Sequence, residues 1–123
     1  MAAETPERLK FEKASRLKTG RDFRRTREEG DRRVQGCLIA NWRPLEPGES
    51  GPRLGVVTSG KIGSAVIRSR ARRLLREAFR LHQAQLVVPV DLVLVARQSI
   101  VGKKFAEVER DYLQALRKAG LLK

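Results

Sequence analysis

The chain has 123 residues, with 27 Lys or Arg against 14 Asp or Glu, so its net charge is +13. This length allows one domain with a modest core and excludes two ordinary domains. A charge this large attracts polyanions, which leaves nucleic acid or an anionic membrane as candidate partners. No apolar run reaches the roughly 18 to 20 residues of a spanning helix. The amino terminus lacks the apolar core of a secretory signal, and the single cysteine, Cys37, fits a reducing compartment. We therefore expect a cytoplasmic protein that binds a polyanion and no membrane.

The first third of the chain predicts a mobile or loosely docked segment followed by a short helix. Residues 1–17 mix charges with few apolar positions. Residues 18–30 read KTGRDFRRTREEG, in which Thr19 can cap a helix and Gly30 can stop it. We place a single folded domain at residues 18–123.

Two strand patterns flank a loop rich in turn residues. Residues 34–42 are rich in β-forming side chains and alternate between two faces. One face carries Leu38, Ala40 and Trp42, and the other carries Cys37 and Ile39. Residues 44–52 contain three prolines and two glycines, so we expect them to join 34–42 and 53–59 as a wide antiparallel hairpin.

Residues 64–82 change to helical periodicity and carry an unusual excess of arginine. The apolar arc of this helix contains Ala71, Leu74, Leu75, Ala78 and Leu81, flanked by Phe79, and the opposite arc contains Arg68, Arg72, Arg73, Arg76 and Arg80. The segment 61–80 alone contributes seven basic side chains and one acidic one, Glu77, which can pair with Arg73 at i−4.

The remaining elements complete a mixed sheet covered by helices. Residues 90–97, VDLVLVAR, form an apolar run typical of a buried central strand. Residues 103–120 predict an amphipathic terminal helix, and a short extra strand fits near 61–64. The order predicts an α+β sandwich.

The arginine arc matches a nucleic-acid backbone in its chemistry and spacing. Guanidinium groups four residues apart rise about 6 Å per step along a helix, which is close to the spacing of successive phosphates. Each planar guanidinium can bind two phosphate oxygens, and binding that releases counterions depends on salt. The spacing does not distinguish RNA from DNA.

The segment RLGVVTSGKIGSAVIRSRARRLLREAFR closely resembles the signature of the protein subunit of bacterial ribonuclease P. The resemblance extends to RLKTGRDFRRTREEG, to DLVLVAR and to FAEVERDYLQALRKAG. It implies a two-layer α-β-β-β-α-β-α fold with a left-handed β-α-β crossover, similar to domain 2 of ribosomal protein S5. The general rule for such crossovers predicts the right-handed form.

The resemblance also implies a function and a set of residues. In that family, the protein assists a catalytic RNA that uses Mg²⁺ to remove the 5′ leader from precursor tRNA, with one protein expected per RNA. The implied RNA-docking residues are Lys61, Arg68, Ser69, Arg70, Arg72, Arg73, Arg76 and Arg80, and the implied leader cleft contains Phe23, Arg27 and Asn41. Ser69 stands where the family usually has Asn, and Arg27 where an aromatic residue is common.

The chain itself shows no convincing catalytic centre. We interpret His82 as a capping or packing residue, Cys37 as a small core residue and Asp91 as a turn cap. The acids Glu107, Glu109 and Asp111 more naturally pair with lysines than form a metal site. Three alternatives remain open: a ribosomal or other structured-RNA-binding protein, a DNA-binding module that uses residues 64–82 as its recognition helix, and a membrane-surface protein.

Overall fold

The computed structural model describes residues 16–17, 20–49 and 51–123. The helices are α2 (Gly20–Glu29), α3 (Ala65–His82) and α4 (Phe105–Lys118), and the strands are β1 (Asp31–Gln35), β2 (Leu38–Pro44), β3 (Arg53–Val57) and β4 (Val90–Ala96). The four strands form one sheet in the order β1-β2-β4-β3. This arrangement confirms the predicted α+β fold and its element order.

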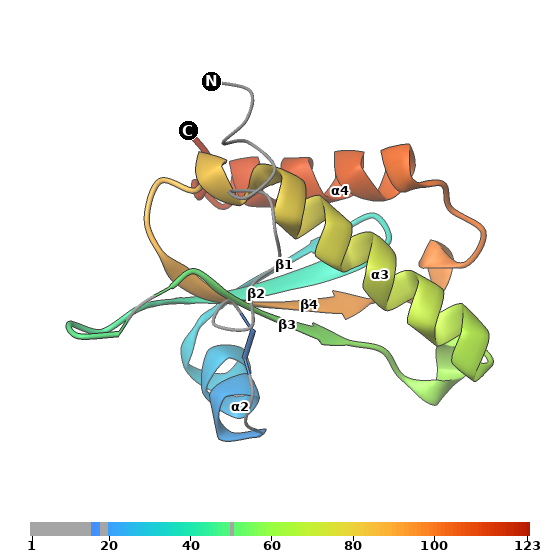
Figure 1. The fold of residues 1–123 in the computed structure, drawn as a ribbon, viewed down its shortest axis with the longest axis horizontal. Coiled ribbons are helices and arrows are strands. Elements are labelled where there is room, and N and C mark those ends of the chain that lie inside the picture. The colour runs from blue at the N-terminus through green and yellow to red at the C-terminus, as the bar shows by residue number, and fades with distance from the viewer. Residues whose placement is uncertain (1–15, 18–19, 50) are drawn as a thin grey trace, which may run out of the picture.

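The helices cover the two faces of the sheet unequally. Helices α3 and α4 lie side by side over one face, and the shorter α2 lies against the opposite face (Figure 1). The main core fills the space under α3 and α4. Its largest fully buried members include Leu38, Leu75, Leu92, Phe79 and Tyr112. The basic helix therefore buries one face in the core and leaves its other face outside.

The predicted strand at 34–42 is wrong in its bounds, because the chain reverses within it. β1 and β2 form an antiparallel hairpin in which Gln35 pairs with Leu38. Gly36 has φ +54° in the turn, a conformation that favours glycine. Leu38, Ala40 and Trp42 face the core as predicted, but Cys37 lies in the turn and joins that core instead of the opposite face.

The predicted wide hairpin between 34–42 and 53–59 is also wrong. β2 and β3 are separated by β4, which pairs antiparallel with β2 and parallel with β3. A parallel β3–β4 pair requires a crossover, and α3 supplies it. This is the β-α-β unit for which the resemblance implies a left-handed connection.

The extra strand expected near 61–64 does not form there. Residues Gly60–Ile62 form a short 3₁₀ helix that leads into α3, and β1 is the additional strand. β1 was missed because four of its five residues are exposed, so it shows no alternation of apolar and polar positions.

The predictions for α3, β4 and α4 are confirmed. Ser64 caps α3 by accepting a hydrogen bond from the Ile67 amide at 3.4 Å. β4 is central and almost wholly buried, as its continuous apolar run indicates. α4 ends at Lys118, and Gly120 follows with φ +76°.

The segment before α2 is described only at two positions. Residues 1–15, for which the sequence predicts mobility, and Thr19, the predicted cap, lie outside the described residues. The amide of Leu17 donates to the carbonyl of Leu54 at 2.9 Å, and Leu17 is buried. Arg16 and Leu17 thus lie along the outer edge of β3. Within the described residues, no helix combines the length and apolar character needed to cross a membrane.

Candidate RNA interface

The arginines of α3 divide into two groups according to the neighbour they approach. Arg72 donates to the Thr58 hydroxyl at 2.7 Å and to the Ser69 hydroxyl at 3.2 Å, on the side of α3 that faces β3. Arg68 donates to the carbonyl of Gly63 at 2.8 Å. These bonds use a minority of the five N–H donors of each guanidinium, so they orient the side chain and leave donors for a phosphate.

Arg68, Arg72 and Arg76 form a row on this flank of α3, and Arg76 lies at its end, towards the outer edge of β3. The described residues offer it no hydrogen bond or ion pair, and it lines a small cavity of about 80 Å³ together with Arg16, Leu17 and Phe23. Burial, followed by the nearby charges of Arg16 and Arg72, lowers the pKa of Arg76. Like charges gathered in this way favour an anion at this edge. Arg16 was missed at the sequence level, because it lies in a segment with no clear pattern.

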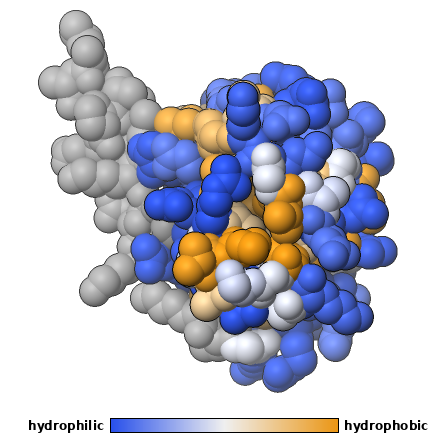
Figure 2. Space-filling view, turned by 90° about the vertical axis from the view of Figure 1, so that its right-hand side faces the viewer, coloured by the Kyte–Doolittle hydropathy of each residue, from blue (hydrophilic) through white to orange (hydrophobic). Residues whose placement is uncertain are grey.

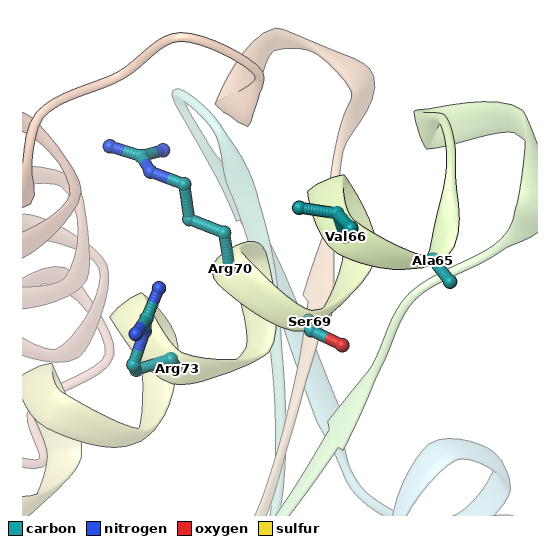
Figure 3. A pocket seen from close by; sticks show the side chains of 5 residues that line it. All are labelled: Ala65, Val66, Ser69, Arg70 and Arg73. Atoms are coloured by element: carbon teal, nitrogen blue, oxygen red, sulfur yellow. The ribbon is translucent and has the colours of Figure 1, made fainter.

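Arg70 and Arg73 face the other flank of α3. Arg70 donates to the carbonyl of Lys103, in the loop before α4, at 2.8 Å. Arg73 is exposed, and both guanidiniums extend towards the same side of the helix (Figure 3). The predicted arc therefore divides: Arg68, Arg72 and Arg76 lie on the β3 flank, whereas Arg73 lies on the α4 flank beside Arg70, which was not part of the arc.

The remaining basic positions of the predicted docking set differ in their availability. Arg80 is engaged by Glu77, with its Nε donating at 3.0 Å, and this hydrogen bond is the main cause of the lowered pKa of Glu77. The predicted Glu77–Arg73 pair is therefore wrong. Lys61 is exposed in the 3₁₀ helix just before α3. Glu77, the one acid of the basic segment, thus pairs with Arg80 at the end of α3 and does not neutralise the arginines from Arg68 to Arg76.

The predicted leader cleft corresponds to the sheet face that carries α2. Phe23 packs on Gly55, where an added Cβ would lie 2.5 Å from the ring. Phe23, Arg24, Arg27 and Glu28 line a groove of about 360 Å³. Asn41 is on the same side of the sheet but buried, and its amide donates to the carbonyl of Val93 at 3.4 Å. Phe23 and Arg27 thus lie together at an open surface, whereas Asn41 lies beneath it.

A buried ion cluster fixes this face of the sheet. Asp91 is fully buried and accepts hydrogen bonds from Arg43 at 2.6 Å and from Arg53 at 2.8 Å through both of its oxygens. Its predicted role as a turn cap is therefore wrong. The hydrogen bond to Asp91 is the main cause of the raised pKa of Arg53.

The same cluster ties the 44–52 loop and α2 to the sheet. Glu49 lies 3.5 Å from Arg43 and 3.8 Å from Arg53, and Asp22 of α2 lies 3.7 Å from Arg53. Arg25 of α2 pairs with Glu46 of the loop. α2 is consequently held by ion pairs at its base, which keeps Phe23 in a defined position.

The groups that could serve a protein nuclease are engaged elsewhere. His82 Nε2 lies 2.7 Å from Glu109 and its Nδ1 lies 2.9 Å from the Gln85 amide, which ties α3 to α4. Burial, with the hydrogen bond to Asp111, raises the pKa of Cys37 to about 12, so the thiol stays protonated. Within the described part of the chain, no three His, Cys, Asp or Glu side chains gather as metal ligands.

Comparison with known proteins shows which family the chain belongs to. Residues 11–120 match the family model for ribonuclease P. The chain is 39% identical over 111 residues to the "Ribonuclease P protein component" of Syntrophomonas wolfei, covering 90% of this chain and 92% of that protein. It is 36% identical over 113 residues to the protein of the same name from Roseiflexus, covering 91% of each. The chain belongs to the ribonuclease P protein family.

Solved structures of ribonuclease P proteins share the fold. The Staphylococcus aureus protein superposes with a TM-score of 0.81 at 25% identity, covering 90% of this chain and all of that one. The Thermotoga maritima protein superposes with a TM-score of 0.74 at 27% identity, covering 84% and 96%. Membership of the ribonuclease P protein family confirms the resemblance.

Proposed function

We propose that the chain is the RNA-binding protein subunit of ribonuclease P and helps the catalytic RNA to remove the 5′ leader from precursor tRNA. The observation that carries the proposal is the row Arg68, Arg72 and Arg76. In this row, hydrogen bonds to Gly63 and Thr58 hold two guanidiniums that no carboxylate of the described residues pairs. Such a row neutralises phosphates at little cost in side-chain ordering, since the chain already orients it. One protein per RNA and a cytoplasmic location are part of the proposal.

The second contact in the proposal is the surface of α2. Phe23 offers an aromatic face to an unpaired base, and Arg27 and Arg24 offer charge to the neighbouring phosphates. The cavity of Arg16, Phe23 and Arg76 lies between this surface and the row on α3. A single strand can therefore run from α3 around the edge of β3 to α2, with cationic contacts throughout.

The chemistry of cleavage is assigned to the RNA, together with Mg²⁺. The acids around the proposed leader surface do not fit a metal site of the protein. Asp22, Glu49 and Asp91 are each paired with arginine, and Glu28 is the single carboxylate among the described residues that line the groove. The protein contributes positive charge and position, which reduce the electrostatic repulsion between the catalytic RNA and its RNA substrate.

The experiment is a magnesium titration of leader removal, with catalytic RNA alone, RNA with the parent chain, and RNA with a variant that carries Arg72→Ala and Arg76→Ala. The parent chain should permit cleavage at Mg²⁺ concentrations at which RNA alone is slow, and the variant should need more Mg²⁺. If the parent chain binds the catalytic RNA and cleavage still depends on Mg²⁺ as it does for RNA alone, the proposal is refuted.

A further inference from the structure

The first turn of α3 exposes apolar surface beside the arginines. Val66 is 79% exposed, the largest exposure among the described large apolar residues, and Ile67 is 36% exposed. Apolar residues gather on the face of the molecule that contains this end of α3 (Figure 2). One exposed valine needs no explanation. Its place next to the docking arginines raises the question of what covers it.

A shallow pocket joins this apolar turn to the two arginines of the α4 flank. The pocket has a volume of about 470 Å³ and is lined by Ala65, Val66, Ser69, Arg70 and Arg73. Its volume lies in the range of small-molecule sites, about 300–1,000 Å³. Val66 and Arg70 project on one side, and Arg73 follows one turn later (Figure 3). The lining combines apolar surface, one hydroxyl and two cations, and includes no acid.

The two arginines of the pocket differ in how firmly they are held. Arg70 is anchored by its hydrogen bond to the carbonyl of Lys103, which spans from α3 to the loop before α4. The described residues offer Arg73 no hydrogen bond or ion pair, so its full set of donors is available. The pocket therefore has a fixed cationic wall, a free cationic side chain and an apolar floor.

We propose that this pocket binds one unpaired nucleotide of the catalytic RNA, with the base on Val66 and its phosphate on Arg73. This inference rests on the proposed function. RNA-binding proteins recognise unstacked bases by placing them on apolar, aromatic or guanidinium surfaces while cations hold the backbone. A nucleotide offers both a flat apolar face and an anion, which matches the lining. A second copy of the chain carries the same +13 charge and is repelled from this face.

The test compares Val66→Ser with Val88→Ser, because Val88 is also exposed, at 47%, but lies outside α3. Affinity for the catalytic RNA is measured over a range of salt concentrations. Val66→Ser should bind about five-fold more weakly, since it loses apolar contact, with an unchanged salt slope, since it removes no charge. Val88→Ser should bind like the parent. Chemical probing of the RNA should show one unpaired nucleotide that the parent protects and Val66→Ser leaves reactive.

The outcomes separate this inference from the proposed function. If the parent chain and Val66→Ser bind equally and protect the same nucleotides, the pocket does not hold a base, while the docking of α3 stands. If sedimentation shows that the parent self-associates and Val66→Ser is monomeric, the patch joins two copies and the inference is wrong. If the parent does not bind the catalytic RNA, both fail.

Discussion

The substitution Asp91→Asn tests the ion cluster that holds α2 and the 44–52 loop on the sheet. Asparagine keeps the size of the side chain but removes its charge and places an amide against two guanidiniums. Arg43 is only 5% exposed, so water cannot replace the lost partner, but Glu49 remains 3.5 Å away; Arg53 keeps Glu49 and Asp22 nearby. Breaking a buried pair by removing one partner costs about 3–5 kcal/mol. Because both arginines keep another acidic neighbour, we expect a loss of unfolding free energy near the lower end, about 3 kcal/mol.

The assay is urea unfolding of the parent and of Asp91→Asn at pH 7, with the slope m compared to verify that the same surface is exposed on unfolding. Glu77→Gln is the matched control, because it removes the partner of Arg80 from a partly exposed pair. The free energy of unfolding of that control should fall by no more than about 1 kcal/mol. An Asp91→Asn loss as small as that of the control would show that the cluster does not hold this face.

Two further substitutions test the account of α4. Tyr112→Phe should leave the free energy of unfolding unchanged or raise it, because the Tyr112 hydroxyl is buried and has no hydrogen-bond partner in the described part of the chain. A loss of unfolding free energy above about 1 kcal/mol in urea would reveal a partner. Glu107 accepts the Lys104 amide at 3.0 Å, and this bond, ahead of the nearby Lys and Arg charges, lowers the pKa of Glu107. Its stabilisation is therefore complete above the unfolded pKa of about 4.3 and is lost as the pH falls through the lower folded value. Unfolding at pH 7 and at pH 3 should show Glu107→Gln less stable than the parent only at pH 7, and an equal difference at both would count against this cap.

The elements with strong local patterns were predictable, and the pairing of the strands was not. α3 has a capping serine and a clear apolar arc, and β4 is apolar except for Asp91 because both of its faces are covered. β1 is an exposed edge strand, whose signal is limited to Gly36 in the following turn. The parallel pairing of β3 with β4 depends on where α3 packs, which no local pattern contains.

The candidate site was predictable where it is local in sequence. Arg68 to Arg76 share one helix, so periodicity placed them on the surface together. Arg70 and Arg72 are two residues apart, so the helical period also predicts their opposite flanks. The neighbours that they contact, Lys103 and Thr58, are distant in sequence and could not be predicted. Asp91 carried a usable signal, since a carboxylate within an apolar strand requires a cationic partner. The sequence alone does not show which of its 27 basic residues is the cationic partner of Asp91.

The central claim is that the arginines on the β3 flank of α3 neutralise phosphates of the catalytic RNA. The most direct measurement is the salt dependence of RNA binding for the parent, for a variant with Arg68→Ala and Arg72→Ala, and for a control with Arg110→Ala and Arg117→Ala. The control removes the same charge from exposed positions on α4. Each lost phosphate contact reduces the slope of log K against log salt by about 0.7–0.9. The account predicts a slope shallower by about 1.5 for the α3 variant, with the control like the parent. Equal slopes for the two variants would contradict it.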